Sequence, residues 1–318
     1  MIGFDIGGTK CAVCIGCEAD GNLKITAKKT IPTDHSVSPY DMIDRLINIA
    51  KELTDKFDVV GISCGGPLNS KEGVIMSPPN LPGWDNIKIV DYIKEKLGCM
   101  AYLENDANAC AIAEWKYGAG KGCNNMVFFT FGTGLGAGLI LDGRLYRGTS
   151  DMAGEAGHIR LCDFGPVGYA KQGSFEGFCS GNGIAQLGVS YASEKLQAGL
   201  KTSFCKDASE LGLITAKKIA ECANEGYEDA IEVYRTCGKM LGRGLSVIID
   251  ILNPEKIVLG SIYERSGNLL KDEMQKVLKK ECLPASLSVC RVVPAQLGDS
   301  IGDYAAIAVA AMNKEAEK

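Results

Sequence analysis

The sequence FDIGGT at residues 4–9 and the sequence FTFGTG at residues 129–134 decide the fold of this chain. In both places an apolar run ends in a turn of glycine and threonine, and a second apolar run follows. The pattern predicts a strand, a tight turn and a second strand at each position. Gly7 and Gly132 are 125 residues apart, which is the size of a domain, so we expect an internal duplication.

Strands and helices alternate around these two turns. We expect strands over residues 2–6, 11–17, 23–31, 59–63, 100–104, 127–131, 135–141, 256–259 and 288–293. We expect helices over residues 40–53, 90–96, 107–116, 269–280 and 301–311, a helical region between 185 and 252, and a long ordered loop over 69–84. The alternation predicts an α/β protein with mostly parallel sheets.

Length and charge narrow the class of protein. A chain of 318 residues is long enough for two domains, each with its own core. Its 34 Lys and Arg residues against 39 Asp and Glu residues give a net charge of −5, so we expect no nucleic-acid partner. Its 39 glycines are about 12% of the chain, against about 7% on average, which favours many turns and close backbone approaches.

The cysteines and the N-terminus indicate a cytoplasmic protein. Fourteen cysteines are scattered along a long chain, which is typical of reduced thiols rather than of a disulfide framework. Cys11 and Cys14 should point to opposite faces of a strand, so we interpret them as small buried side chains rather than as metal ligands. Residues 1–5 do not resemble a signal peptide. No apolar run reaches the ~18 residues of a membrane span, so we expect no membrane partner.

The two glycine turns could hold phosphate groups. Backbone N–H groups converge on an anion where no side chain blocks the approach, so Gly7, Gly8, Thr9 and Lys10 could grip a polyphosphate together with Gly132, Thr133 and Gly134. Each turn by itself could also be a plain β-hairpin. Gly132, Gly134 and Ala137 fit the loose dinucleotide pattern GxGxxA, but a Rossmann turn opens a helix and a strand continues here. A nicotinamide-dependent dehydrogenase is therefore disfavoured.

Two acidic residues have a functional and a structural interpretation. Asp5 lies on an otherwise apolar strand beside the first turn, where its carboxylate could bind Mg²⁺ directly or through water. Backbone N–H groups could instead satisfy it. Asp106 follows a predicted strand and precedes a predicted helix, so it could be a general base or a helix N-cap.

These residues resemble the sugar kinases of the actin/hexokinase-like ATPase superfamily, and more narrowly the ROK family (repressor, open reading frame, kinase). The resemblance covers nearly the whole chain. It rests on six motifs in order, namely DIGGTK at 5–10, GGP at 65–67, PNLPGW at 79–84, ENDANA at 104–109, GTGLG at 132–136, and GEAGH at 154–158 with Glu176 before Ser180 and Gly181.

The resemblance implies a duplicated actin-like, ribonuclease H-like fold of two lobes with a cleft between them. We expect a smaller lobe of residues 1–107 plus 300–318 and a larger lobe of residues 108–299. It also implies that ATP and Mg²⁺ bind at the two glycine turns, with Gly260 on the adenosine side, and that Asp106 is the general base.

The resemblance further implies which residues bind a hexose. Glu155 and His158 are three residues apart, so a helical or turn-like segment would place them on one face. His35, the other histidine, is given no role. The implied sugar-binding residues are Gly66, Asn80, Asn105, Asp106, Glu155, His158 and Glu176. The family also suggests a homodimer.

The leading interpretation is an ATP-dependent hexose kinase that acts on the 6-hydroxyl, with glucose ahead of N-acetylhexosamines and fructose. A sugar-responsive regulator of the same family is the alternative. Such regulators carry a helix-turn-helix segment ahead of the kinase-like part, and we expect none here because the first phosphate-turn strand begins at Ile2. An actin-like nucleotide switch without sugar chemistry is a third interpretation.

The family's zinc-binding motif is absent. Many relatives have the pattern CxCGxxGCxE after the Gly-His motif, and its three cysteine positions fall here on Val167, Tyr169 and Ser174. These residues cannot supply thiolates, so we expect no structural zinc. We expect the apolar and aromatic side chains of residues 164–169 to pack in place of the metal, and His158 to be free to bond the sugar or a neighbouring carboxylate.

Overall fold

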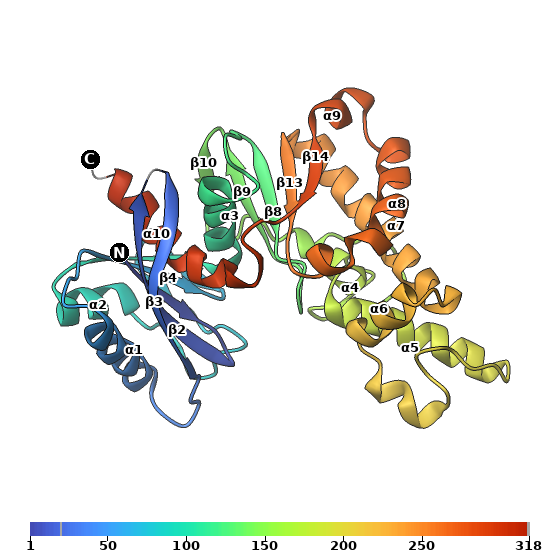
Figure 1. Ribbon diagram of the computed structural model, residues 1–318, viewed down its shortest axis with the longest axis horizontal. Helices are drawn as coiled ribbons and strands as arrows, with labels where there is room; N and C mark the ends of the chain where they lie inside the picture. The colour runs from blue at the N-terminus through green and yellow to red at the C-terminus, as the bar shows by residue number, and fades with distance from the viewer. Residues whose placement is uncertain (20, 317–318) are drawn as a thin grey trace. The chain divides into compact units, whose positions relative to one another are not determined.

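The computed structural model describes residues 1–19 and 21–316 (Figure 1). Residue 20 and residues 317–318 lie outside the described residues, and the expected smaller lobe includes the last two. The chain divides into two compact units. The first comprises Met1–Phe128, Gly138–Gly154 and Gln296–Lys318, and the second comprises Phe129–Ala137 and Glu155–Ala295. The expected lobe boundary after residue 107 stays a prediction.

The first five-stranded sheet has the order β3-β2-β1-β4-β7. Its strands are β1 (Ile2–Ile6), β2 (Lys10–Ala19), β3 (Asn22–Pro32), β4 (Val59–Cys64) and β7 (Met100–Asn105). Strands β1, β2 and β3 pair antiparallel, and β1, β4 and β7 pair parallel. The five strands expected in this part of the chain are confirmed, and each differs from its expected bounds by no more than two residues.

The second five-stranded sheet has the order β10-β9-β8-β13-β14. Its strands are β8 (Met126–Phe129), β9 (Ala137–Leu141), β10 (Arg144–Tyr146), β13 (Lys256–Leu259) and β14 (Arg291–Pro294). The pair β9–β10 is antiparallel and the pair β13–β14 is parallel, as in the corresponding places of the first sheet. The repeated order matches the duplication expected from the two glycine turns.

Helices cover both faces of the first sheet. Helices α1 (Pro39–Leu53) and α2 (Ile89–Leu97) pack on one face, and α10 (Ile301–Ala316) packs on the other and against α3 (Asp106–Tyr117) (Figure 1). Helix α1 begins at Pro39 because the Ser38 hydroxyl accepts a hydrogen bond from Asp41 N (3.1 Å). Its apolar residues at helical spacing are the ones buried against the sheet.

Small residues let α10 approach the sheet closely. A Cβ at Gly3 would lie 2.9 Å from Ala306 Cβ, and a Cβ at Gly16 would lie 2.7 Å from a methyl carbon of Ile307. At Gly61 in β4 a Cβ would overlap the backbone carbonyl of Ala306 and lie 2.6 Å from Ala310 N. The glycines of the sheet and the alanines of α10 therefore set the distance between the two layers.

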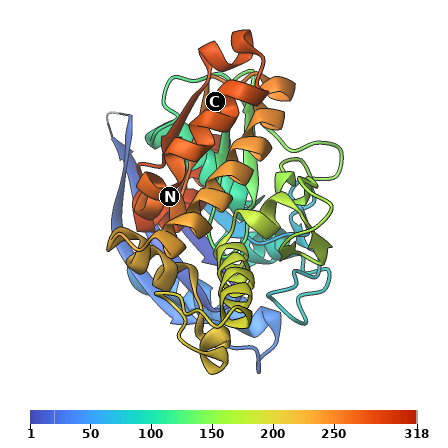
Figure 2. The same cartoon turned by 90° about the vertical axis from the view of Figure 1, so that its right-hand side faces the viewer.

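The second unit is mostly helical. Its elements are the short helices η1 (Ala156–His158), α4 (Phe175–Phe178), η2 (Ala208–Leu213) and α9 (Pro284–Val289), the longer helices α5 (Gly181–Gln197), α6 (Ala216–Asn224), α7 (Glu228–Leu252) and α8 (Ile262–Glu281), and the small hairpin β11 (Val167–Gly168) and β12 (Lys171–Gln172). Helices α7 and α8 lie side by side (Figures 1 and 2). The remaining short elements are the hairpin β5 (Leu68–Asn69) and β6 (Val74–Ile75) and η3 (Gly298–Ser300).

Three expected elements have wrong boundaries. The last helix, α10, extends to Ala316 instead of ending near residue 311. Helix α8 begins at Ile262 rather than near residue 269, because Ser261 and Glu264 form a capping box at its start. The strand expected over 288–293 begins at Arg291, because the preceding residues form α9 with Pro284 in its first turn.

The cysteine expectations hold where the structure addresses them. All fourteen cysteines are free thiols. Cys11 packs in the core beneath α1, whereas Cys14 packs with Ile307 of α10, so the two point to opposite faces of β2. No helix in residues 1–19 or 21–316 has the length and apolar character needed to cross a membrane.

The contact between β4 and α10 gives a testable prediction. Gly61→Ala should lower the free energy of unfolding by about 1–3 kcal/mol or more, because the added methyl group meets helix backbone that cannot rotate away. Gly212→Ala is the control, since a Cβ there meets nothing within 4 Å. Urea denaturation measures both, and equal stability of the two variants would contradict the close packing of α10.

Candidate active site

The first glycine turn, residues 7–10, joins β1 to β2 and is held by residues that follow β3. The Thr33 hydroxyl donates to Gly7 O (2.6 Å), and Thr33 N donates to Thr9 O (3.0 Å). The ring Nε2 of His35 donates to Gly8 O (2.8 Å). Thr33 and His35 therefore fix the carbonyl groups of the turn. The motifs did not identify either residue. Thr33 and His35 reach the turn because β2 pairs with β3, with Lys10 opposite Pro32, and a local motif does not show this pairing.

Four of the sequence-predicted residues of the first unit meet around Asn80. A Cβ at Gly8 would overlap the Asn80 carbonyl oxygen and lie 2.9 Å from Asn80 Cβ. A Cβ at Gly65 would lie 3.4 Å from Asn80 Oδ1, and one at Gly66 would lie 3.3 Å from Asn105 Nδ2. The absence of a side chain lets Gly8 of the first glycine turn approach Asn80. It also lets Gly65 and Gly66 approach the amide groups of Asn80 and Asn105, which can bind hydroxyl groups.

Asp106 is the first residue of α3, and Asn105 is its N-cap. Asn105 Oδ1 accepts hydrogen bonds from Ala107 N (3.0 Å) and Asn108 N (3.4 Å). Asp106 Oδ1 accepts a hydrogen bond from the adjacent Ala107 N (2.8 Å), and Asp106 is an exposed residue. The alternative interpretation of Asp106 as the N-cap is therefore wrong. The surrounding protein disfavours the charged form and raises the pKa of its carboxyl above the usual value, while the Ala107 bond opposes this.

Asp5 lies near two other carboxylates at the end of β1. Burial, followed by the negative charges of Asp303 and Asp106, raises the pKa of Asp5 to about 6. A Cβ at Gly302 would lie 2.9 Å from Asp5 Oδ2, so helix α10 reaches the carboxylate where it has a glycine. A cation would relieve this concentration of negative charge, which makes Asp5 suitable for Mg²⁺.

The second glycine turn, residues 132–134, is closed by its own backbone. Gly132 N donates to Gly134 O (3.0 Å), and Gly181 N at the start of α5 donates to Gly132 O (2.7 Å). Gly260 N donates to Phe129 O (2.9 Å), which brings the end of β13 beside the turn. The structure thus brings Gly132 and Gly260 together within the second unit, as expected for a nucleotide-binding site.

A cavity of about 680 Å³ opens beside this second turn. Its lining includes Gly132, Thr133, Asn182, Tyr234, Ser261 and Arg265. Ser261 has a φ of 53°, a left-handed conformation that strains a serine, and Arg265 Nη2 donates to its hydroxyl (3.0 Å). The volume lies within the usual range for small-molecule sites, and the lining combines a glycine turn with apolar and polar side chains.

Glu155, His158 and Glu176 gather near the same turn. Glu176 Oε2 accepts a hydrogen bond from Leu135 N (3.0 Å). Glu155 precedes the single turn η1 and His158 is its last residue, and His158 N donates to Glu155 O (3.1 Å). A Cβ at Gly157 would lie 3.3 Å from Glu176 Cβ, so η1 packs closely on the segment that carries Glu176. The turn-like segment expected for Glu155 and His158 is present.

Backbone and amide groups hold the loop that carries the zinc motif in relatives. Gln186 of α5 accepts from Val167 N and donates to Val167 O, both at 2.9 Å. Leu161 N donates to Gly173 O (2.8 Å), and Gly173 N donates to Pro166 O (2.9 Å). These bonds fix both ends of the loop.

The expected packing of residues 164–169 is wrong. Phe164 is 78% exposed, Val167 47% and Tyr169 68%. The loop is closed by hydrogen bonds and therefore needs no apolar core. Tyr169 meets the edge of the His158 ring, with the ring centres 5.3 Å apart. Ser174 is buried and caps α4 by accepting from Gly177 N (3.0 Å).

The family model described as "ROK family" matches residues 1–313. The chain belongs to the ROK family. A glucokinase of Streptomyces coelicolor is 30% identical over 305 residues, which cover 95% of this chain and 94% of that protein. A xylose repressor of Caldicellulosiruptor bescii is 24% identical over 82% of this chain and 64% of the repressor.

Solved structures of the ROK family share the fold. A ROK glucokinase from Streptomyces griseus, in complex with glucose and AMPPNP, has a TM-score of 0.75 and 28% identity, and the match covers 98% of this chain and 99% of that one. The mixed α/β fold expected from the motifs, with the actin-like architecture of ROK kinases, is confirmed.

The zinc expectation stays a prediction with a direct measurement. Among residues 1–19 and 21–316, no group of three His, Cys, Asp or Glu side chains is placed to hold a metal ion by itself. Elemental analysis of protein purified without a histidine tag should find far less than one zinc per chain, because Val167, Tyr169 and Ser174 replace the thiolates. Stoichiometric zinc that is lost on His158→Ala would contradict this interpretation of the loop.

Asp5 gives a prediction about stability. Its pKa of about 6 in the folded chain exceeds the ordinary value of 3.8, so the folded state binds more protons between these pH values. Stability falls as pH rises through this window and stays reduced above it. Asp5→Asn should therefore raise Tm at pH 7 in EDTA and have little effect at pH 3.5.

Asp34→Asn is the control of opposite sign. Hydrogen bonds from Ser36, then from Arg45, lower the pKa of Asp34 to about 2. Asp34 stabilises the folded state at pH values above the pKa that it has in the unfolded chain, and this stabilisation is lost at lower pH. Asp34→Asn should therefore lower Tm at pH 7. A Tm of Asp5→Asn at or below that of the wild type at pH 7 would contradict the interpretation of Asp5.

Proposed function

We propose that this chain is an ATP-dependent hexose kinase that transfers the γ-phosphate to the 6-hydroxyl of glucose or a closely related sugar. The observation that supports this most directly is the state of Asp106. Asn105 caps α3, so the Asp106 carboxylate next to it is not used as the cap, and Asp106 is exposed. Similarity over nearly the whole chain to glucokinases, one of them solved with glucose and AMPPNP, supports the same reaction.

Asp106 would act as the general base. It would take the proton from the attacking hydroxyl while the γ-phosphate is transferred, and a pKa raised above the usual value makes the carboxylate a better proton acceptor. Phosphoryl transfer otherwise depends on positioning and charge neutralisation. Asn80, Asn105 and the backbone of Gly66 would orient the sugar, together with Glu155, His158 and Glu176.

The two glycine turns would bind the phosphates of ATP. Residues 7–10 and residues 132–134 would offer backbone N–H groups, and the cavity beside Thr133 and Gly260 would hold the nucleoside. Asp5 would hold Mg²⁺ directly or through water, with the remaining positions filled by phosphate oxygens and water. The cation supplies charge neutralisation. ATP and free sugar meet in the cytoplasm, where we place the reaction.

A sugar-responsive regulator is the second candidate, because the chain also resembles a xylose repressor. The match covers 64% of that repressor, so it leaves about a third of the repressor unmatched. A gel shift in which this protein binds DNA at physiological salt, with a known DNA-binding protein as the control, would support the regulator. The choice among glucose, N-acetylhexosamines and fructose depends on residues 69–84 and 155–181, which would contact the remaining hydroxyls.

A coupled ADP-release assay over a panel of hexoses tests the proposed function. The panel includes glucose, fructose, N-acetylglucosamine and N-acetylmannosamine, with 6-deoxyglucose as the matched control that lacks the acceptor hydroxyl. ADP release should require Mg²⁺ and one of the hexoses, and 6-deoxyglucose should give none. A folded protein with no turnover on any sugar would refute the proposal.

Asp106→Asn should lower kcat by about 10²–10⁴-fold, the range for loss of a general base. The fold should be retained, because Asn105 still caps α3. Sugar binding should be preserved, and the rise in Tm on addition of the sugar measures it. Asp91→Asn is the control, since Asp91 is also an exposed acid in the first turn of a helix, α2. An unchanged kcat in Asp106→Asn would exclude the role of base.

A further inference from the structure

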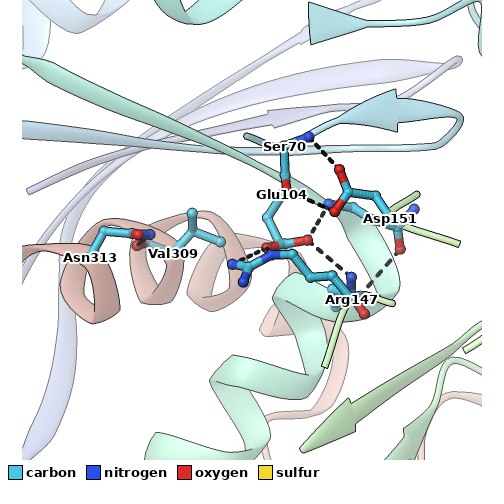
Figure 3. Close-up of polar contacts among 8 residues, drawn as sticks. Ser70, Glu104, Arg147, Asp151, Val309 and Asn313 are labelled. Carbon is cyan, nitrogen blue, oxygen red and sulfur yellow. Dashed lines mark hydrogen bonds and ion pairs between the residues drawn. The ribbon is translucent and has the colours of Figure 1, made fainter. Parts of the chain in front are cut away.

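Glu104, the residue before the Asn105–Asp106 pair, is a fully satisfied buried carboxylate. Its side chain is 1% exposed. Oε2 accepts a hydrogen bond from Arg147 Nε (2.8 Å) and forms an ion pair with Arg147 Nη2 (2.7 Å) (Figure 3). Oε1 accepts from Asn105 N (3.1 Å) and Asn108 Nδ2 (3.0 Å). A carboxylate taken out of water needs such partners, and the arginine supplies both a positive charge and a hydrogen bond.

The bonds to Oε1 lie on both sides of the candidate base. Asn105 precedes Asp106 and Asn108 follows it, so one carboxylate oxygen of Glu104 accepts hydrogen bonds from both sides of the junction between β7 and α3. Because a carboxylate only accepts, the Asn108 amide must turn its nitrogen toward Glu104. Its oxygen, Oδ1, is then buried without a hydrogen-bond partner among the described residues. The two hydrogen bonds to Glu104 Oε1 are present although they leave the buried acceptor Asn108 Oδ1 unsatisfied.

Arg147 comes from the segment that precedes Glu155. Its carbonyl accepts from Ala153 N (3.1 Å), which closes residues 147–153 into a compact loop. The Asp151 carboxylate of the same loop accepts from Ser70 N (2.7 Å) and from the Ser70 hydroxyl (3.0 Å) (Figure 3). Two ionic or charge-assisted contacts therefore anchor this loop within the first unit, one at Glu104 and one at Ser70.

The Glu104–Arg147 pair is poorly suited to a purely stabilising role. The Arg147 side chain is 33% exposed, next to a hollow of about 810 Å³, while Glu104 is buried. The burial of Glu104 raises the pKa of its carboxyl, and Arg147 only partly opposes this. Ion pairs of this kind contribute little net stability, whereas loss of one partner leaves a charge uncompensated. In some proteins, buried pairs of this kind specify one arrangement of the groups around them.

We propose that Glu104 and Arg147 are positioning residues for the phosphoryl transfer: they fix Asn105 and Asp106 in the orientation that the reaction requires. The proposal rests on the proposed function. Neither residue needs to touch the substrates. Glu104 acts on the Asn105 backbone and on the first turn of α3, and Arg147 fixes Glu104 in turn and ties it to the loop that leads to Glu155.

Kinetics of four variants and a matched control test this. The variants are Arg147→Met, Glu104→Gln and the double variant, with Arg147→Lys as the conservative replacement. The control is Glu114→Gln, because Glu114 is also fully buried on α3 but lies near its other end. There it accepts from Ala119 N (2.7 Å), Gln296 N (2.9 Å) and Leu297 N (2.8 Å).

Arg147→Met should lower kcat about 10- to 100-fold while KM for ATP stays within about twofold, because misplacement of a reacting group affects the chemical step. Arg147→Lys should recover part of the loss. The double variant should be no worse than the poorer single variant, since both break the same contact. Glu114→Gln should lower the urea midpoint yet keep kcat. A kcat in Arg147→Met equal to that of the wild type, or a parallel loss in Glu114→Gln, would overturn the proposal.

Hydrogen exchange separates this proposal from the proposed function. Arg147→Met should speed exchange in residues 103–110, where Asn105 N and the capped amides of α3 lie, and Glu114→Gln should leave that peptide unchanged. If the wild type phosphorylates no sugar, the proposed function fails, and this exchange experiment still decides whether Glu104 and Arg147 hold the junction. Unchanged exchange in Arg147→Met would overturn the positioning role.

Discussion

The candidate site depends on the hydrogen bonds between Asn105 and the first turn of α3. Asn105 Oδ1 accepts from Ala107 N and Asn108 N, so the helix is capped by the residue before Asp106. A carboxylate that capped the helix itself would have a lowered pKa and would be occupied. Here the Asp106 side chain stays exposed and the pKa of its carboxyl is raised. Because Asn105 caps the helix, the neighbouring Asp106 keeps a carboxylate with a raised pKa at the end of β7.

Local sequence patterns were enough to predict most of the sheets and the groups around the first turn. The glycine turns, the strands beside them and the cluster of Gly66, Asn80 and Asn105 follow from motifs that lie within a few residues of one another. Thr33 and His35 could not be found in this way, because they reach the turn through the pairing of β2 with β3. The start of α8 was not predicted, because the capping box of Ser261 and Glu264 does not interrupt a run of apolar residues and so gives no visible boundary in the sequence.

The loop over residues 161–173 shows how a fold can dispense with a metal ligand set. The sequence showed that thiolates were absent, and it suggested apolar packing as the substitute. The structure uses a paired amide instead, with Gln186 donating to and accepting from the backbone of Val167. Nothing local identifies Gln186, which lies 19 residues away on α5, so this contact depends on the tertiary arrangement. Phe164 and Tyr169 are left exposed as a consequence.

The two copies of the glycine turn differ in one polar side chain. The aligned stretches place Thr130 where the first copy has Asp5. The Thr130 hydroxyl accepts a hydrogen bond from Gly136 N (3.0 Å), so its side chain closes its own turn. In the first copy, burial and the acidic neighbours of Asp5 raise the pKa of its carboxyl to about 6. Two copies of one backbone motif therefore differ in a side chain that closes its own turn in one copy and is a carboxylate in the other, and for this reason the proposed function assigns the cation to the first copy.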